Sequence, residues 1–177
     1  MRKVILFIAM SLDGYIADKN GNVDWLVGQD PRQDDLDTYT SFIESVDTVI
    51  MGYKTYDQIV SVLSPDVWVY EDLKSYVFTH KSIPSTHHIH FINDDVCQFV
   101  KELRKEEGKD IWICGGANII QQLLQNDMID EYIITIIPTI LGKGISLFST
   151  LQDEMKLEVK DVQERNGIVQ INYQRKR

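Results

Sequence analysis

The stretch IWICGGANIIQQLL, residues 111–124, carries the clearest structural signal in the chain. Four largely apolar residues lead into Gly115 and Gly116, and an amphipathic run follows at once. This pattern predicts a buried strand that turns directly into a helix. The start of a helix carries free N–H groups and a partial positive charge, and glycine lets a phosphate contact the backbone where a Cβ would block it. Two alternatives stay open at this point: a tight turn that binds nothing, and a cis Gly–Gly peptide.

Strands and helices alternate along the rest of the chain. Apolar runs predict strands at residues 3–10, 47–52, 75–80, 89–92, 110–114 and 130–138. Helical spacing predicts helices at residues 34–46, 53–63, 93–108 and 118–127, the third of them capped by Asn93 or Asp94. Asn166-Gly167 predicts a closing β-hairpin. We therefore expect one α/β domain, residues 1–177, with a mostly parallel central sheet and an antiparallel C-terminal hairpin.

The composition excludes several classes of function. The chain has 177 residues, of which 44% are hydrophobic and 25% charged, and a formal net charge of −9. A nucleic-acid-binding surface should be basic, so we expect no such partner. The first apolar run stops after residue 10 without a small-residue cleavage site, and no window reaches the length of a membrane span. We expect a cytoplasmic protein that does not contact a membrane.

Cysteine and histidine usage favours neither a disulfide nor a metal site. Cys97 and Cys114 lie far apart in apolar patterns, as reduced core residues do. His87, His88 and His90 cluster, but no carboxylate or cysteine accompanies them in the pattern. We expect no metal.

Polar or glycine segments follow three of the predicted strands. GYKTY (residues 52–56), THKS (79–82) and GGANI (115–119) each stand at the carboxyl end of a strand, where open α/β sheets bind ligands. Lys54 in a first helical turn opposes the helix dipole unless it reaches an anion. Together these segments predict a ligand with several phosphates, such as a dinucleotide.

With these segments in this order, the chain resembles the dihydrofolate reductase-like superfamily, and within it the reductase domain of the bifunctional riboflavin-biosynthesis deaminase-reductase. LFIAMSLDGYIADKNGNVDWL (residues 6–26) is similar to the first strand and active-site loop of that superfamily, DTVIMGYKTYDQI (47–59) to its phosphate-binding strand and helix, YVFTH (76–80) to the strand end near the adenosine phosphate, and ICGGANIIQQLL (113–124) to its cis Gly–Gly step. The resemblance implies a three-layer sandwich and an NADPH-dependent reductase.

Carried onto this chain, the resemblance implies that NADPH is bound by Ala9, Ile16, Trp25, Gly52, Lys54, Thr55, Thr79, His80, Lys81, Gly115, Gly116, Ala117, Asn118 and Ile119. Ala9 would contact the nicotinamide carboxamide through its backbone, and Ile16 and Trp25 would line the nicotinamide side of the loop. Gly52, Lys54 and Thr55 would contact the pyrophosphate, residues 79–81 the adenosine ribose phosphate, and residues 115–119 would cradle the cofactor.

Three positions depart from the family pattern. Tyr53 follows the helix-opening glycine, where a basic residue is frequent, and Asn118 also replaces a frequent basic residue. Tyr15 stands where the riboflavin reductases typically have Lys, which argues against their ribosylamino-pyrimidine substrate. Lys143 lies in PTILGKG, which is similar to a segment near the substrate end of the site; the alternative is a flexible connecting loop.

The resemblance also implies a carboxylate on the first helix. On the predicted helix 34–46, Asp35 shares a face with Tyr39 and Phe42, and a carboxylate beside aromatic rings can hold a raised pKa and donate a proton. An N-terminal helix acid is the alternative role of Asp35. Asp13 is a second candidate acid, and its alternative role is that of a turn residue before Gly14.

The sequence thus predicts an NADPH-dependent reductase that transfers hydride to a small heterocyclic, pterin- or pyrimidine-like substrate. The activity would be like that of 5-amino-6-(5-phosphoribosylamino)uracil reductase or of dihydrofolate reductase. A homodimer is expected by analogy. The alternative is a nucleotide-binding module of the same fold without efficient catalysis.

Overall fold

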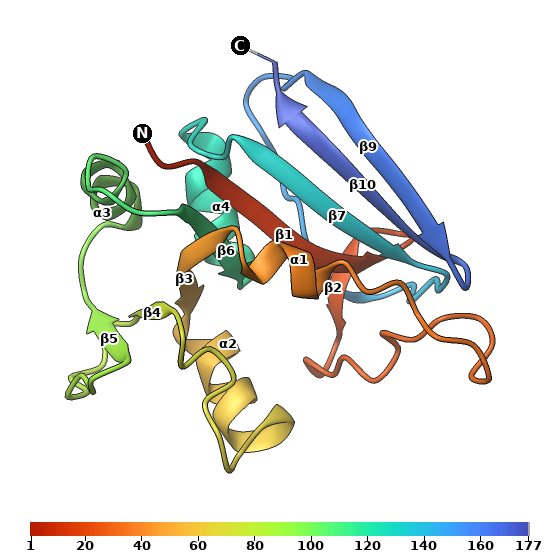
Figure 1. Ribbon diagram of the computed structural model, residues 1–177, viewed down its shortest axis with the longest axis horizontal. Coiled ribbons are helices and arrows are strands. Elements are labelled where there is room, and N and C mark those ends of the chain that lie inside the picture. Colours follow the sequence, from red (N-terminus) through yellow and green to blue (C-terminus); the bar gives the residue numbers. More distant parts are fainter. Residues whose placement is uncertain (177) are drawn as a thin grey trace.

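The computed structural model describes residues 1–176 and is built around one eight-stranded sheet with the strand order β5-β4-β3-β6-β1-β7-β10-β9 (Figure 1). The strands are β1 (Val4–Ser11), β3 (Val46–Gly52), β4 (Lys74–Phe78), β5 (Ile89–Ile92), β6 (Asp110–Gly115), β7 (Glu131–Ile137), β9 (Leu157–Arg165) and β10 (Ile168–Arg175). The first six strands in this order, β5, β4, β3, β6, β1 and β7, run parallel to one another. Strand β10 pairs antiparallel with both β7 and β9. The predicted fold class is confirmed.

Helices cover both faces of the sheet. On one face lie α3 (Val96–Leu103) and α4 (Ala117–Gln125), and on the other lies α1 (Tyr39–Ile43) (Figure 1). Helix α2 (Tyr53–Gln58) and the π-helical turn η1 (Ile59–Leu63) follow β3, and a separate ribbon pairs β2 (Tyr15–Asp18) with β8 (Gly144–Ser146).

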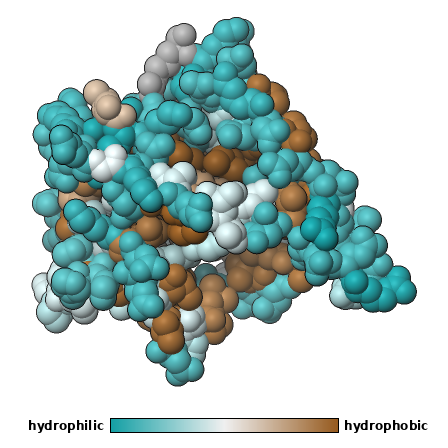
Figure 2. All heavy atoms as spheres, viewed as in Figure 1, coloured by the Kyte–Doolittle hydropathy of each residue, from teal (hydrophilic) through white to brown (hydrophobic). Residues whose placement is uncertain are grey.

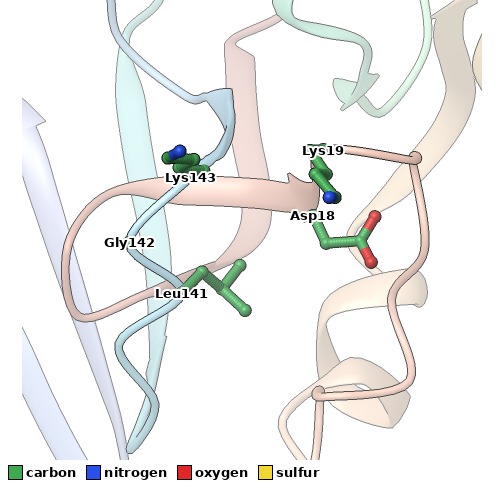
Figure 3. A pocket seen from close by; sticks show the side chains of 5 residues that line it. All are labelled: Asp18, Lys19, Leu141, Gly142 and Lys143. Atoms are coloured by element: carbon green, nitrogen blue, oxygen red, sulfur yellow. The ribbon is translucent and has the colours of Figure 1, made fainter.

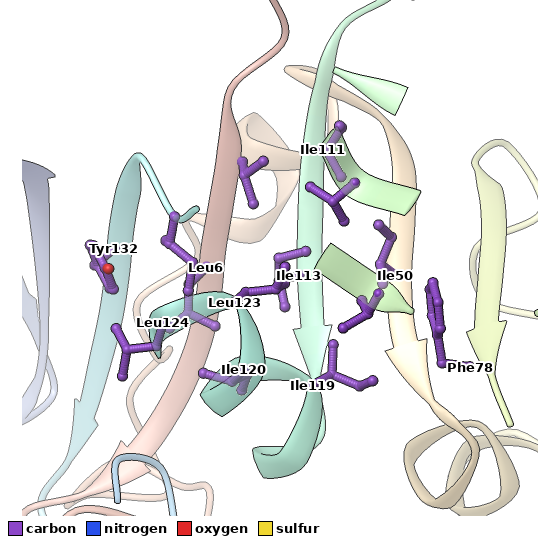
Figure 4. Close-up of a cluster of buried hydrophobic side chains, with 14 of the residues drawn as sticks. Leu6, Ile50, Phe78, Ile111, Ile113, Ile119, Ile120, Leu123, Leu124 and Tyr132 are labelled. Carbon is purple, nitrogen blue, oxygen red and sulfur yellow. The ribbon is translucent and has the colours of Figure 1, made fainter. Parts of the chain in front are cut away.

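The central strands are apolar on both faces, because each face meets a core of its own. Leu6 and Ile113 point toward Ile120 and Leu123 of α4 (Figure 4), and all four are almost completely buried. On the opposite face a second cluster forms around Trp112, together with Ile5, Phe42, Val49 and Val77. The apolar runs expected of strands buried on both sides therefore have this physical basis.

The surface is mostly polar, and apolar side chains break through it in separate places (Figure 2). One such place is the η1 region at the bottom of Figures 1 and 2, where four large apolar residues are exposed: Val62, Leu63, Val67 and Val69.

The helix predicted at residues 34–46 is wrong in its first half, since α1 begins only at Tyr39. The Asp37 carboxylate accepts hydrogen bonds from the Thr40 N–H (3.2 Å) and hydroxyl (2.9 Å), as it would in an N-terminal turn. Acidic residues in this stretch thus compete with helix continuation toward the N-terminus. The face that Asp35 was predicted to share with Tyr39 does not exist.

Helix α3 was also predicted with the wrong cap. Asp95, not Asn93 or Asp94, precedes its first residue, and the Gln98 N–H donates to Asp95 Oδ1 at 2.7 Å. The C-terminal hairpin is confirmed: Asn166 and Gly167 have φ values of 54° and 76°, as a two-residue turn with both central residues left-handed requires.

Three further findings concern residues 1–176. Within them, no helix combines the length and apolarity needed to span a membrane. Both cysteines are free thiols. No group of three His, Cys, Asp or Glu side chains in this part of the chain could hold a metal ion.

Candidate active site

The three strand ends singled out in the sequence lie side by side at one edge of the sheet. Strands β4, β3 and β6 are consecutive neighbours, with Gly52 opposite Phe78 and Met51 opposite Gly115. The segments that follow them, 79–82, 52–56 and 115–119, therefore meet at the carboxyl edge, as predicted. Strand β1 is the next neighbour of β6 and carries Ala9 near its own carboxyl end.

The glycines lie where two backbones approach closely. A Cβ at Gly52 would stand 3.4 Å from Ile119 Cγ1 and 3.9 Å from the Gly116 nitrogen, and a Cβ at Gly116 would stand 3.3 Å from Thr55 Oγ1. Gly115 has φ +144°, and its peptide bond to Gly116 is cis. Side chains at these positions would fill the space between β3 and α4.

Helix α4 begins at this step without a side-chain cap. Its N-cap is Gly116, and Ala117 and Asn118 open the first turn. Asn118 directs its Oδ1 to Gln122 Nε2, 2.7 Å away, and so does not cap the helix. The first amides are left for an anion, which the partial positive charge of the helix start attracts.

Cationic side chains gather at the β3–β4 end of this edge. Lys81 Nζ lies 3.8 Å from the centroid of the Tyr53 ring. The Lys81 N–H donates to Thr79 Oγ1 at 3.1 Å, and His80 Nδ1 lies 2.8 Å from Asn93 Oδ1. Because an amide oxygen only accepts, His80 Nδ1 is the donor in this contact. Lys54 is exposed on the neighbouring helix α2.

An aromatic surface lies beside β1 and β6 on the α1 face of the sheet. The Phe7 ring stacks on Phe42 at 4.2 Å, and the Tyr39 ring is 6.0 Å from that of Trp112. The Trp112 indole N–H donates to the Phe7 carbonyl oxygen at 3.0 Å, which joins the two strands through a side chain. Ala9 continues the same face of β1 toward the carboxyl edge.

Two neutral donors belong to this surface. The Tyr70 hydroxyl lies 3.8 Å from Cys114 Sγ, and the Tyr70 ring is 5.0 Å from the Trp112 ring. Burial raises the pKa of Cys114 to about 11 and raises the pKa of Tyr70 well above its ordinary value. Burial also raises the pKa of Tyr39. All three groups are therefore protonated and uncharged at neutral pH.

Asp13 holds a loop in place. Its carboxylate accepts hydrogen bonds from the Ser11 hydroxyl (2.6 Å) and from the amides of Leu141 (3.1 Å) and Gly142 (2.7 Å). These bonds, that from Ser11 foremost, hold the pKa of Asp13 below its ordinary value. A carboxylate stabilised as an anion is a poor proton donor, so these contacts favour the alternative role of Asp13 as a turn residue.

Asp35 lies in an exposed loop and not on a helix. Its Oδ1 accepts from Asn166 Nδ2 at 2.6 Å, and its Oδ2 accepts from the Gly28 N–H at 3.2 Å. Asn166 stands in the turn between β9 and β10, near the carboxyl ends of β7 and β1. Asp35 is thus at the expected edge of the sheet, but its observed partners are a turn and a loop.

The loop predicted to line the nicotinamide, which carries Ile16 and Trp25, forms contacts within itself and with the core. Trp25 is half-buried and its indole N–H donates to the Asn22 carbonyl oxygen at 3.1 Å, and Ile16 packs against the core on the α4 side. An open pocket of about 410 Å³ lies beside this loop. Figure 3 shows the residues that line it, Asp18, Lys19, Leu141, Gly142 and Lys143.

Sequence reasoning missed the aromatic surface, the contact of Lys81 with Tyr53, and the hydrogen bond by which Asn166 holds Asp35. One signal in the sequence could have revealed part of the aromatic surface. Cys114 directly precedes the glycine pair, and strand alternation places it on the same face as Trp112. Tyr39 and Tyr70 come from segments that no local pattern connects to that face.

A family model described as the RibD C-terminal domain matches residues 2–170. The uncharacterized protein YwjB of Bacillus subtilis (strain 168) is 43% identical over 177 residues, which cover 98% of each chain. A crystal structure of a Shewanella sp. PV-4 protein, provisionally assigned to riboflavin biosynthesis, superposes with a TM-score of 0.84 at 32% identity, with 99% of each chain covered.

Two longer proteins match over part of their length. The riboflavin biosynthesis protein RibD of Haemophilus influenzae is 24% identical, and the match covers 95% of this chain but 55% of RibD. A Thermotoga maritima diaminohydroxyphosphoribosylaminopyrimidine deaminase/5-amino-6-(5-phosphoribosylamino)uracil reductase shares the fold, with a TM-score of 0.70 at 18% identity, covering 98% of this chain and 56% of that one.

Proposed function

The chain belongs to the RibD C-terminal domain family, and on that premise we propose that it is an NADPH-dependent reductase of a small pyrimidine- or pterin-like heterocycle. Membership in the family supports an oxidoreductase of the pyrimidine reductase type, since the Thermotoga relative is named a 5-amino-6-(5-phosphoribosylamino)uracil reductase. The cofactor and the kind of substrate are our proposal.

One observation carries the proposal: three backbone segments that are open to a ligand converge on a single edge of the sheet. A Cβ at Gly52 would stand 3.4 Å from Ile119 Cγ1 and one at Gly116 would stand 3.3 Å from Thr55 Oγ1, so glycine leaves the backbone at both positions uncovered. The uncapped start of α4 offers amides for a pyrophosphate, and Lys81 stands two strands away at the end of β4. The residues present therefore fit an extended ligand with several phosphates.

When bound, NADPH would supply the hydride, and the residues of this chain would hold and orient both reactants. A flat heterocycle would pack at the edge of the aromatic surface, against the partly exposed rings of Phe7 and Tyr39, because Trp112 beside them is buried. The neutral Tyr70 hydroxyl and Cys114 thiol can donate hydrogen bonds to a carbonyl oxygen or ring nitrogen there. These contacts would orient the acceptor C=N or C=O toward the nicotinamide.

The test is a titration with NADPH followed by turnover. Binding is measured from the melting temperature and protein fluorescence, and turnover from NADPH absorbance with dihydrofolate and with panels of pyrimidines and pterins. We expect NADPH to raise the melting temperature and at least one heterocycle to be reduced. Unchanged melting temperature and fluorescence at high NADPH concentration would disprove the proposal.

A second candidate function is nucleotide binding without efficient catalysis. It is favoured by the engagement of both candidate acids, since Asp13 and Asp35 each accept hydrogen bonds from loop residues. Tight NADPH binding without oxidation across all panels would support this candidate over the reductase.

We propose that residues 1–177 form one domain that acts in the cytoplasm on a small molecule, as a homodimer, and binds neither nucleic acid nor membranes. Light scattering of the purified chain decides the oligomeric state.

A further inference from the structure

We propose that Tyr39 is the proton donor of the reduction. This inference rests on the proposed function and names a catalytic residue for it. Reduction of a C=N or C=O group adds a hydride to the carbon and a proton to the nitrogen or oxygen, and a nicotinamide cofactor supplies only the hydride. The proton has to come from the protein or from water.

The carboxylates that precede α1 in the chain are directed at other donors. Asp35 accepts hydrogen bonds from Asn166 Nδ2 and from the Gly28 N–H, and Asp37 accepts from the N–H and hydroxyl of Thr40. Both carboxylates belong to exposed residues. The acidic proton for the reaction is therefore to be sought among the other groups at the aromatic surface.

Tyr39 places a hydroxyl on the part of the aromatic surface that a ligand can reach. It is the first residue of α1, and its ring lies 6.3 Å from that of Phe7 and 6.0 Å from that of Trp112. Tyr39 is 39% exposed, whereas Trp112 is 4% exposed. Among residues 1–176, no group forms a hydrogen bond with the Tyr39 hydroxyl. This hydroxyl is thus free to donate to a heterocycle that packs on the rings.

Two further acidic groups lie near Tyr39. They are Cys114 of β6 and Tyr70, whose thiol and hydroxyl are 3.8 Å apart. Burial first, and the nearby Cys114 second, raise the pKa of Tyr39. Burial also raises the pKa of Tyr70, and Cys114 and Tyr39 raise it further. Because Cys114 directly precedes Gly115, these three groups gather next to the glycine step, where the cofactor is proposed to bind.

Of these three groups, Tyr39 is the one that can both give a proton and regain it. The Tyr70 hydroxyl and the Cys114 thiol contact each other, and both residues are less exposed than Tyr39. From β1 and β6 the Tyr39 ring meets Phe7 and Trp112, which do not titrate. An exposed phenol exchanges its proton with water between turnovers, and a raised pKa keeps it protonated throughout the neutral range.

The step balances in atoms and electrons. As the hydride forms a C–H bond, the π electron pair of the C=N group moves to the nitrogen. The nitrogen takes the proton of Tyr39 Oη, and the O–H bond breaks to leave a phenolate. A nitrogen anion without this proton is far more basic than a phenolate, so even a phenol with a raised pKa is acidic enough. Water then returns a proton to the phenolate.

The experiment uses the full chain with NADPH and a heterocycle that the wild type reduces in the panels of pyrimidines and pterins. Tyr39→Phe keeps the ring and removes the hydroxyl. We expect its kcat to fall about a hundredfold, with KM and the dissociation constant of NADPH unchanged. Tyr76→Phe is the matched control and should keep the wild-type kcat. Tyr76 is a half-buried tyrosine of β4 that packs against Phe99 on the α3 side of the sheet.

The pH dependence separates a proton donor from a structural residue. The wild-type kcat should stay constant between about pH 6 and 9, because Tyr39 keeps its proton over this range. The residual kcat of Tyr39→Phe should fall about tenfold per pH unit, because hydronium ions then supply the proton. A readout without turnover is the tyrosinate absorbance of the wild type minus that of Tyr39→Phe. It should show that Tyr39 ionises at a higher pH than free tyrosine.

Four results would overturn the inference. They are an unchanged kcat in Tyr39→Phe, a loss of kcat that is equal at every pH, ionisation of Tyr39 at a lower pH than free tyrosine, and a hundredfold loss in Tyr70→Phe without one in Tyr39→Phe. The last result would assign the proton to Tyr70. If the wild type oxidises NADPH with none of the heterocycles, the proposed function itself fails, and that outcome is recognised before any variant is measured.

Discussion

The side-chain amide of Asn166 donates to Asp35 Oδ1 over 2.6 Å and joins the C-terminal hairpin to a loop 131 residues earlier in the chain. The same amide group donates to the Asp30 carbonyl oxygen at 3.0 Å, and Asn166 Oδ1 accepts from the Asp30 N–H at 3.0 Å. Asn166 is only 7% exposed. One turn residue thus clamps the loop 28–35 at the carboxyl edge of the sheet.

We predict that Asn166→Ala destabilises the protein by about 2–4 kcal/mol, because it removes three side-chain hydrogen bonds. It also leaves alanine at φ 54°, a left-handed conformation that asparagine tolerates better than alanine does. At this chain length, each kcal/mol lowers the melting temperature by about 2–4 °C. Thermal unfolding followed by circular dichroism measures the loss. Asn166→Gly can adopt the left-handed conformation without strain, so its loss of stability measures the side-chain hydrogen bonds alone. Wild-type stability of that variant would contradict the role of Asn166 as a clamp.

We predict that Asp35→Asn retains turnover within about tenfold, because the observed partners of this carboxylate are a turn and a loop amide rather than a buried aromatic pocket. The measurement is kcat for the heterocycle identified in the panel, together with the melting temperature. A fall of kcat by a factor of about a hundred or more in a folded variant would restore Asp35 as the acid.

We predict that Gly116→Ala weakens NADPH binding at least about tenfold while the fold persists. The new Cβ would stand 3.3 Å from Thr55 Oγ1 and would fill space next to the start of α4. Calorimetric titration with NADPH measures the effect. Gly142→Ala serves as a control for glycine replacement elsewhere, since its Cβ would meet nothing within 4 Å, although its φ of +72° adds strain. Unchanged affinity in Gly116→Ala would show that the cofactor does not approach this backbone.

We predict that Cys114 reacts slowly with iodoacetamide at pH 8 and faster as the pH approaches 11, because its pKa is raised to about 11. At pH 8 this corresponds to about a hundredfold less thiolate than in an unperturbed thiol. The variant Cys97→Ser leaves Cys114 as the single thiol for mass-spectrometric labelling. Rapid labelling near pH 7 would contradict the burial of this group.

The raised pKa of Cys114 also predicts how the stability of the protein changes with pH. A thiol whose pKa is raised on folding disfavours the thiolate in the native state, so its contribution is complete below the unfolded pKa of about 9. That contribution is lost as the pH rises from about 9 through 11. The expected signature is a fall in melting temperature over this interval that is smaller in a Cys114→Ala variant, in which other groups with pKa values raised by burial, Tyr39 and Tyr70 among them, still contribute.

Much of the architecture could be predicted from local patterns. The apolar run 111–114 and the amphipathic run after it became β6 and α4, and Asn166-Gly167 became the hairpin turn. Such patterns are readable because strand burial, helical periodicity and left-handed turns depend on neighbours in the chain. The convergence of residues 52–56, 79–82 and 115–119 was also predictable, since parallel strands end at a common edge.

The roles of the acids could not be read in this way. Helical spacing suggested that Asp35 faces Tyr39, but Asp37 hydrogen-bonds to Thr40 and α1 begins only at Tyr39. The partner of Asp35 lies in the last hairpin, and that of Asp13 lies in the 141–142 loop. A carboxylate can be assigned a task only when its hydrogen-bond donors are known.

The strands of the central sheet, the glycines that leave the backbone open and the closing hairpin could be predicted from the sequence, because these features depend on interactions between near neighbours. The short ribbon of β2 and β8 was missed, and only the folded chain shows that Lys81 rests on Tyr53, that Tyr70 meets Cys114 and that Asn166 holds Asp35. Those contacts depend on strand order and on loop paths between elements far apart in the chain, and no local periodicity encodes them.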